Sequence, residues 1–330
     1  MKLRALAAAV GLVCAGLFPV TGADAAAPPA PAVAPPAPRQ LFGDIGVHDP
    51  SMVRARNGVY YVYGTHNGLG ALASRDLVHF RAAGAAFPDG VAWATDYSGD
   101  PRELWAPDVS FHNGQYWLYY AASSFGSNHS AIGLATSRTG EPGQWRDHGI
   151  IYSSTSTDDF NAIDPGLTVD RSGRWWLSLG SFWSGIRMIE LDPRTGTPAQ
   201  WNSTLYSIAQ RPAPDAVEGA YIIQHGGYYY AFASYDFCCR GVDSTYNIKV
   251  GRSRSITGPY VDQDGVSLLN DGGTPVLATH GSVIGPGGQT VLRVGGRDLL
   301  VYHYYDGNDQ GNPKLGLNRL IWDRGWPRVS

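Results

Sequence analysis

Residues 161–181 read NAIDPGLTVDRSGRWWLSLGS. An acidic residue, Asp164, precedes a Pro-Gly turn, and a short apolar strand is expected at residues 167–169. Residues 170–173 carry the Asp, Ser and Gly typical of a tight hairpin turn, and residues 175–179 form an aromatic-rich second strand. The stretch therefore predicts an antiparallel hairpin with a carboxylic acid at its head.

The same layout recurs four more times along the chain. Each copy has an ionisable head, a short apolar strand, a turn and an aromatic or apolar return strand. The five heads are Asp49, Asp108, Asp164, Glu218 and His280, and they lie 59, 56, 54 and 62 residues apart. Four-stranded units at such spacing predict an all-β fold, a five-bladed β-propeller whose innermost strands surround a central channel. Five ionisable groups near one axis exceed what a structural repeat requires, so function is expected there.

Composition restricts the ligand class. The chain has 330 residues, a net charge of −3 and only 16% charged residues, below the usual proportion of roughly a quarter. This balance argues against nucleic acid or an anionic membrane as a partner and favours a neutral ligand. Walker, GxSxG and HExxH motifs are absent from the sequence. The Gly-rich residues 285–288 lack the strand–helix context of a phosphate loop and are expected to form a hairpin turn.

The N-terminus has the pattern of a secretory signal. Lys2 and Arg4 precede an apolar run, and Ala23-Asp24-Ala25 is a small-x-small cleavage pattern. We predict a signal peptide at residues 1–25, a Pro/Ala-rich extended linker at 26–40 and a single catalytic domain at 41–330. The predicted localisation is secreted and extracellular.

Two cysteines, Cys238 and Cys239, would remain after cleavage. Neighbouring cysteines do not join distant parts of a fold, so free thiols and a vicinal disulfide both stay open. Zinc requires more ligands than this pair has nearby. A local structural role is expected.

Three of the heads have the chemistry of a glycoside hydrolase. One carboxyl protonates the leaving oxygen, a second activates water, and a third near the acid raises its pKa. Asp49, Asp164 and Glu218 supply three such groups. An Asp before Pro or Gly also caps turns, but recurrence at blade spacing favours catalysis. Asp108 is in the same register, and it reads equally well as a structural corner.

Aromatic residues near the heads are suited to stacking on sugar rings. Trp105, Phe182 and Trp183 are the candidates. The runs at residues 175–176 and 228–230 are instead expected to pack within or between sheets.

Taken together, four motifs resemble family 43 glycoside hydrolases, and most of all the arabinan-degrading enzymes. These motifs are VHDP at residues 47–50, LWAPD at 104–108, NAIDPG at 161–166 and VEGA at 217–220, and the segments 180–185 and 238–246 are similar to the same group. The resemblance extends from about residue 41 to the C-terminus. It implies a five-bladed propeller that hydrolyses α-1,5-linked arabinofuranose with inversion, with Asp49 as general base, Glu218 as general acid and Asp164 as the residue that tunes the acid.

The resemblance also implies a set of sugar-binding residues and an ion. The residues implied to line the sugar subsites are Gly126, Asn161, Ala162, Ile163, Ser181, Phe182 and Trp183. His280 resembles an imidazole that holds a central ion, usually calcium, for which water would complete the oxygen shell; a purely structural His280 is the alternative.

The expected substrate is arabinan or its oligosaccharides, cleaved internally by a monomer. Exo action, activity on xylan or arabinoxylan, and a non-catalytic sugar-binding propeller remain as alternatives.

Overall fold

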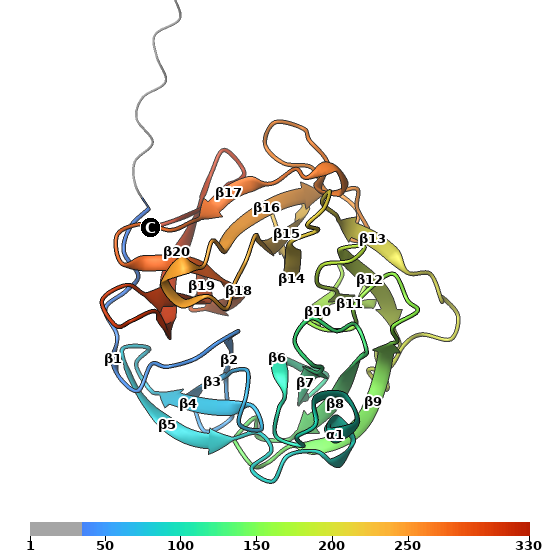
Figure 1. Cartoon of the computed structure of the whole chain (residues 1–330), viewed down its shortest axis with the longest axis vertical. Helices are drawn as coiled ribbons and strands as arrows, with labels where there is room; N and C mark the ends of the chain where they lie inside the picture. The colour runs from blue at the N-terminus through green and yellow to red at the C-terminus, as the bar shows by residue number, and fades with distance from the viewer. Residues whose placement is uncertain (1–34) are drawn as a thin grey trace, which may run out of the picture. The chain divides into compact units, whose positions relative to one another are not determined.

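Twenty-one strands form five sheets in residues 35–330, the part of the chain that the computed structural model describes. Figure 1 shows the five sheets arranged in a ring around a common axis. The prediction of an all-β, five-bladed propeller is confirmed. The predicted signal peptide at residues 1–25 and the linker up to residue 34 lie outside the described residues.

Each blade is an antiparallel sheet whose strands follow one another in the chain. The first contains β2 (Ser51–Arg54), β3 (Tyr60–Tyr63), β4 (Gly70–Ser74) and β5 (His79–Ala85). The second contains β6 (Trp105–His112), β7 (Gln115–Ala122), β8 (Ser130–Ser137) and β9 (Arg146–Ser154). The third contains β10 (Gly166–Val169), β11 (Trp175–Leu179), β12 (Ile186–Leu191) and β13 (Tyr206–Ala209). The fourth contains β14 (Val217–His225), β15 (Tyr228–Tyr235), β16 (Asn247–Ser253) and β17 (Thr274–Leu277). The fifth contains β18 (Val283–Val294), β19 (Arg297–Asp306), β20 (Asn312–Asp323) and β21 (Trp326–Val329).

The hairpin predicted at residues 161–181 is present as β10 and β11, which pair from Gly166–Ser178 to Val169–Trp175. Asp170 organises its turn: one carboxylate oxygen accepts the backbone N–H groups of Ser172 and Arg174, and the other accepts the indole N–H of Trp176. An Asp at the first turn position satisfies local donors in this way. The hairpin repeat that predicted the fold is therefore stabilised by its own side chains.

The blades pack against one another through apolar and aromatic side chains. The innermost strands contact each other in the order β2, β6, β10, β14, β18 and back to β2, which closes the ring. Five buried clusters lie one between each pair of neighbouring blades. Trp175 and Trp176 are each 2% exposed, and Tyr230 is 1% exposed. The prediction that these aromatic runs pack rather than bind sugar is confirmed.

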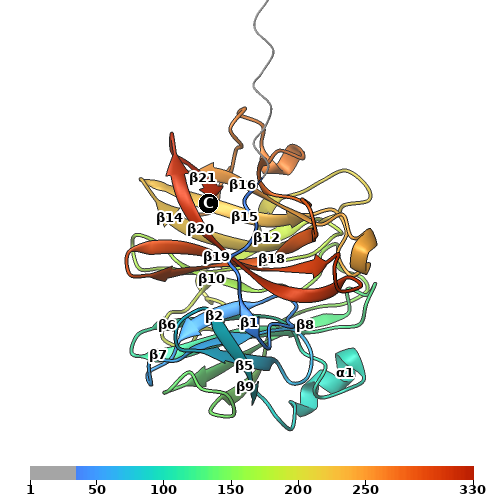
Figure 2. The same cartoon turned by 90° about the vertical axis from the view of Figure 1, so that its left-hand side faces the viewer.

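The N-terminal segment joins the first and last blades. β1 (Phe42–Gly43) pairs in parallel with β5, whereas Gly46 bridges Lys314 and the N–H of Leu315 in β20 donates to Ile45 O at 2.8 Å. Figure 2 shows this segment passing over the edge of both blades. Ring closure therefore depends on residues that precede the first repeat, and for this reason the repeat pattern did not reveal it.

One local prediction is wrong. Residues 285–288 lie inside β18, not in a hairpin turn, and pair irregularly with β19 through Ile284–Tyr305 and Gly287–His303. The glycines are required because the backbone runs tightly past other side chains: a Cβ on Gly287 would lie 2.1 Å from the Tyr246 ring. Glycine in a strand commonly marks such a close approach or a bulge.

Cys238 and Cys239 form a disulfide, which decides between the two states left open by the sequence. The helical segments are short: η1 (Ala92–Ala94), α1 (Thr95–Ser98), η2 (Gly241–Asp243) and η3 (Leu268–Asn270). Among the described residues, none of these helices has the length and apolar character needed to cross a membrane.

Candidate active site

Three carboxyl groups from three blades lie close enough to influence one another. Asp49 immediately precedes the Pro that leads into β2, Asp164 precedes β10, and Glu218 is the second residue of β14. Asp49 and Glu218 both raise the pKa of Asp164 electrostatically, as does its burial. The structure thus brings together the three residues that the sequence predicted to be catalytic.

Asp49 and Asp164 share an unusual backbone conformation. Their φ angles are +46° and +54°, in the left-handed region that non-glycine residues seldom occupy. Such a conformation costs about 1–3 kcal/mol and persists only where other contacts enforce it. Both residues precede proline, and the equivalent residue in the second blade is Ala106, with φ +42° before Pro107.

Asp108 therefore lies two residues past the position that Asp49 and Asp164 occupy. It was expected in the same register, and this expectation is wrong. Its side chain is 2% exposed, and one carboxyl oxygen accepts the N–H of Leu167 at 2.7 Å while the other has no partner. Burial raises the pKa of Asp108 to about 7. It links the second blade to the third, as the alternative interpretation of a structural corner predicts.

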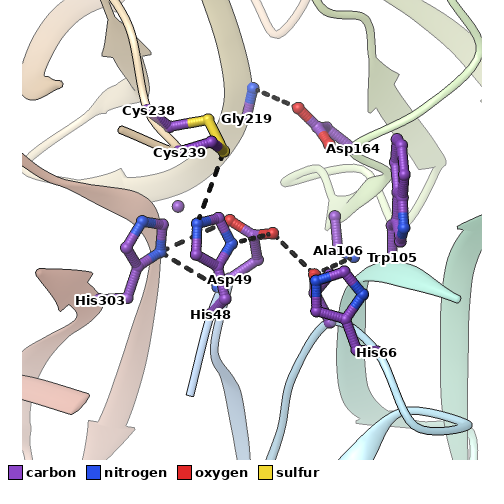
Figure 3. Close-up of polar contacts among 12 residues, drawn as sticks. His48, Asp49, His66, Trp105, Ala106, Asp164, Gly219, Cys238, Cys239 and His303 are labelled. Carbon is purple, nitrogen blue, oxygen red and sulfur yellow. Dashed lines mark hydrogen bonds and ion pairs between the residues drawn. A yellow bond between two sulfur atoms is a disulfide. The ribbon is translucent and has the colours of Figure 1, made fainter. Parts of the chain in front are cut away.

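Asp49 is surrounded by groups that favour its ionised form. His48 Nδ1 lies 2.8 Å from Asp49 Oδ2 (Figure 3). The Thr65 hydroxyl donates to the same oxygen at 2.7 Å. Although burial alone would raise the pKa of Asp49, the charge and hydrogen bond of His48 and the hydrogen bond of Thr65 lower it below its ordinary value. An ionised carboxylate of this kind is suited to accept a proton.

Glu218 has the opposite tendency. Burial raises the pKa of Glu218 and the charge of Asp49 raises it further, whereas hydrogen bonds from Ser181 and Tyr246 partly oppose the shift. The Tyr246 hydroxyl donates to Oε1 at 2.6 Å, and the Ser181 hydroxyl donates to Oε2 at 2.5 Å. Two carboxyl groups whose environments drive their pKa values apart are the usual signature of a base and an acid in one site.

Asp164 lies beside the acid. Its Oδ2 accepts the N–H of Gly219, the residue after Glu218, at 3.1 Å (Figure 3). Gly219 is held from its other side, because Gln289 donates to the Gly219 carbonyl at 2.7 Å. Asp164 is therefore fixed relative to Glu218 through the backbone.

The residues predicted to line sugar subsites divide into two groups. Asn161 is 3% exposed and Ala162 is fully buried, and the Asn161 amide bonds Ser130 and Ser127. These two residues hold the loop that carries Asp164, so their side chains do not face a ligand. Ile163 is 7% exposed and also packs inward, and Ser181 contacts Glu218 directly.

The other predicted residues retain surface that a ligand can reach. Gly126 is exposed, with φ +79° and open space where a Cβ would be. Phe182 and Trp183 are half-buried with positive φ angles of 52° and 45°, and the Phe182 ring lies 6.0 Å from that of Phe237. Trp105 is half-buried, and its indole N–H donates to Glu103 at 2.7 Å.

Four residues at the site were not predicted as functional: His48, Thr65, Tyr246 and His303. His48 lies in the VHDP motif and Tyr246 lies in the segment 238–246, both of which resemble family 43. Their place in these motifs could have indicated a function. Thr65 lies in the loop between β3 and β4, 16 residues from Asp49. His303 lies in the fifth blade, 254 residues from Asp49, and reaches it because the blades close into a ring.

His280 is not among the groups that act on the three carboxyls. Its Nδ1–H donates to the Ala278 carbonyl at 2.8 Å, which leaves Nε2 as a buried lone pair without a partner. A ligand histidine often donates its other N–H to a carbonyl in this way. However, no three-ligand cluster in the described residues includes His280, and calcium prefers six to eight oxygen ligands. The side chains present therefore do not fit a calcium site by themselves.

The two clusters that gather ligand atoms in the described part of the chain have most of those atoms in other bonds, although His303 Nε2 is buried without a partner, so neither cluster offers three free ligand atoms. His48, Asp49 and His303 lie within 4.8 Å of one another, but His303 Nδ1 accepts the Asp49 N–H and His48 Nδ1 faces Asp49. The other cluster, His48 with Cys238 and Cys239, has its sulfur atoms in a disulfide. Neither arrangement fits a metal ion.

A groove of about 950 Å³ lies elsewhere, at the opposite end of the second blade from these carboxyls. It is lined by the start of β7, the end of β8 and the start of β9, and by residues 194–197. Its lining contains Arg138, Arg146 and His148 but no carboxyl group, so general acid–base hydrolysis is not supported there.

Comparison with known proteins agrees with this geometry. Residues 43–327 match the model for glycosyl hydrolases family 43. An "Extracellular endo-alpha-(1->5)-L-arabinanase 1" of Bacillus subtilis (strain 168) is 44% identical over 307 residues, which cover 91% of each chain. An "Extracellular exo-alpha-(1->5)-L-arabinofuranosidase ArbA" of Cellvibrio japonicus (strain Ueda107) is 36% identical and covers 87% of each chain.

Among solved structures, a "GH43 Endo-Arabinanase from Bacillus licheniformis" superposes with a TM-score of 0.82 at 46% identity, covering 88% of this chain and 99% of that one. The family match spans nearly all of the described propeller, and the relatives are matched over most of their own length. The chain belongs to glycosyl hydrolases family 43.

Proposed function

We propose that this protein is an endo-acting arabinanase that hydrolyses α-1,5-linked L-arabinofuranose in arabinan with inversion. The observation that carries the proposal is the meeting of carboxyl groups from different blades in one site, with Asp49 held by His48 and Thr65 and Glu218 held by Ser181 and Tyr246. Two relatives named for endo action are 44% and 46% identical to this chain, against 36% for one relative named for exo action. This difference favours internal cleavage over release from a chain end.

In the proposed reaction Glu218 protonates the glycosidic oxygen as the bond to the sugar breaks. Asp49 accepts a proton from the water that attacks the opposite face of the ring, so the product forms with inverted configuration. Asp164 fixes the position of Glu218 through the Gly219 N–H, and its carboxyl opposes the simultaneous ionisation of Glu218. Trp105, Phe182 and Trp183 supply the aromatic surface that contacts sugar rings.

The deciding experiment is product analysis on linear debranched arabinan, beside xylan and arabinoxylan. A ladder of arabino-oligosaccharides, lost in Glu218→Gln, supports endo cleavage with Glu218 as the acid. A single short product would shift the proposal to exo action, and activity only on xylans would replace the substrate. Sugar binding without hydrolysis by the wild type would leave a non-catalytic binding module.

Proton NMR of the first products tests the stereochemistry. Inversion of an α-linked furanoside releases the β anomer before mutarotation equilibrates the two. Early accumulation of the α anomer would contradict the roles assigned to Asp49 and Glu218.

We further propose that the protein is secreted and acts as a monomer. The supports are the signal-like sequence at residues 1–25 and the word "extracellular" in the names of both relatives. Mass analysis of protein recovered from culture medium tests cleavage after residue 25, and light scattering tests the monomer.

We also propose a calcium ion bound by His280, with water molecules as its other ligands. One buried Nε2 lone pair supports it, and water would have to provide the oxygen ligands. Metal analysis of the purified wild type and of His280→Ala tests it: equal calcium content in both would remove His280 as a ligand.

A further inference from the structure

A continuous chain of hydrogen bonds runs from the disulfide turn to Asp49. The backbone N–H of Cys239 donates to Tyr305 Oη at 2.7 Å, and Tyr305 Oη lies 2.8 Å from His48 Nε2. His48 Nδ1 in turn lies 2.8 Å from Asp49 Oδ2. Figure 3 shows His48 between Asp49 and the disulfide. Tyr305 is only 3% exposed, so this chain is largely shielded from solvent.

The Tyr305 hydroxyl suits His48 in either protonation state. It donates to Nε2 of a neutral ring and accepts from the Nε2–H of an imidazolium. In both cases Nδ1 carries the hydrogen that faces Asp49. The ring is therefore held in one place while its charge changes.

His303 fixes the same carboxylate from the other side. Its ring stacks on that of His48 with centroids 3.7 Å apart, and its Nδ1 accepts the backbone N–H of Asp49 at 3.1 Å. Burial, and then the neighbouring His48, lower the pKa of His303 well below its ordinary value. His303 is thus a neutral acceptor, and its Nδ1 has no hydrogen to donate to Asp49 Oδ1, which lies 3.5 Å away.

The two oxygens of Asp49 consequently differ. Oδ2 receives hydrogen bonds from both His48 and Thr65, and Thr65 is itself oriented because its oxygen accepts the Ala106 N–H at 2.9 Å. Oδ1 receives no hydrogen bond from the described residues. Gly288 packs against it so closely that a Cβ there would lie 2.4 Å from Oδ1.

We propose that His48 and Tyr305 are positioning residues that occupy Asp49 Oδ2 and so leave Oδ1 as the oxygen that accepts the proton of the attacking water. The inference rests on the proposed function in one respect, the role of Asp49 as general base. The disulfide turn supplies the fixed end of the chain through the Cys239 N–H.

Tyr305→Phe is the first test, because it removes one hydroxyl and keeps the ring. We expect kcat on linear arabinan to fall about tenfold with KM changed less than twofold, and the acidic limb of the kcat–pH profile to move to higher pH. The limb moves upward because a less firmly held His48 stabilises the Asp49 carboxylate less. Tyr304→Phe is the matched control, because Tyr304 is the adjacent residue and its hydroxyl makes no hydrogen bond in the described structure. It is expected to leave kcat, KM and the acidic limb of the kcat–pH profile unchanged.

Two substitutions of His48 separate its two contacts. In His48→Asn the amide nitrogen takes the place of Nδ1 and still reaches Asp49, whereas in His48→Gln it takes the place of Nε2 and reaches only Tyr305. We expect Gln to lower kcat about tenfold more than Asn. Equal losses in the two variants, with equal melting temperatures, would overturn the positioning role.

A substrate-free measurement separates this inference from the proposed function. Carbon-13 NMR titration of the Asp49 carboxyl is expected to give a higher pKa in Tyr305→Phe than in the wild type. If Tyr305→Phe does not fold, His48→Gln takes its place, with the same expected result. An unchanged titration overturns the inference whatever the enzyme hydrolyses. A wild type inactive on every polysaccharide, with the titration shifted as expected, would instead overturn only the proposed function.

Discussion

Asp49, at the head of the first blade, and Asp108, in the inner strand of the second, have environments that favour opposite protonation states. Asp49 receives hydrogen bonds from His48 and Thr65 on one oxygen, and its pKa is lowered. Asp108 receives one hydrogen bond, from Leu167, and burial raises its pKa to about 7. Burial of a carboxyl group alone therefore favours its protonated form. A general base requires the additional donors that only the junction of several blades supplies.

The largest expected effect follows from removing the base itself. Asp49→Asn keeps the size of the side chain and an acceptor for Thr65 but cannot take up a proton. We expect kcat on arabinan to fall by about 10²–10⁴, the range typical of a lost general base. Asp108→Asn is the matched control, with wild-type kcat expected; a loss of less than tenfold in Asp49→Asn would contradict its role.

Asp164→Asn sharpens the comparison by removing an ionisable group without removing a contact, since the amide oxygen still accepts the Gly219 N–H. Burial, and then the charges of Glu218 and Asp49, raise the pKa of Asp164, so Asp164 and Glu218 oppose each other's ionisation; with the amide this repulsion is absent and the acid loses its proton at lower pH. We expect the basic limb of the kcat–pH profile to move down by about one pH unit, with kcat at the optimum reduced about tenfold. A basic limb that stays in place would show that burial alone sets the pKa of Glu218.

Thr65→Val should produce a smaller change on the Asp49 side. It removes one of two donors to Oδ2, so the acidic limb is expected to move to higher pH and kcat to fall severalfold. It also leaves the Ala106 N–H without an acceptor, which lowers the free energy of unfolding by about 1–3 kcal/mol. Thr65→Ser retains the hydroxyl and serves as control. Equal kcat–pH profiles in Thr65→Val and Thr65→Ser would show that His48, without Thr65, keeps the pKa of Asp49 low.

Much of the fold was predictable because each blade repeats its own local chemistry. Asp170 and its turn show this: the residues that form the hairpin are consecutive in the sequence. The same locality explains why Asp49, Asp164 and Glu218 were found, since each stands next to a turn before an inner strand.

What the sequence did not reveal depends on contacts between blades. His303 approaches Asp49 across a separation of 254 residues, and β1 closes the ring outside the repeat. The register of Asp108 was misjudged because Ala106, not an acid, adopts the left-handed conformation in its blade. The glycines of residues 285–288 were taken for a turn because their real cause, close packing against Tyr246 and Asp49, lies in other blades.

The smallest expected effect concerns Asp108. It changes only the pH dependence of the free energy of unfolding. Because the pKa of Asp108 is raised to about 7 in the folded protein, the wild type gains stability from the protonated acid at low pH and loses it as pH rises towards and through that value. Asparagine resembles the protonated acid and has no such dependence. The free energy of unfolding of Asp108→Asn minus that of the wild type should therefore be about 2 kcal/mol larger at about pH 8 than at about pH 5.

Thermal or denaturant unfolding at the two pH values measures this shift, with activity as a second readout that should not change. Asp49→Asn is expected to show no such shift between these two pH values, because the lowered pKa of Asp49 keeps it ionised at both, and its contribution to stability is lost only as pH falls below the ordinary carboxyl value. If both substitutions showed the same pH dependence of stability, burial would be acting alike on both acids. The donors around Asp49 would then have no measurable influence on its charge, and the distinction between the two blades would fail.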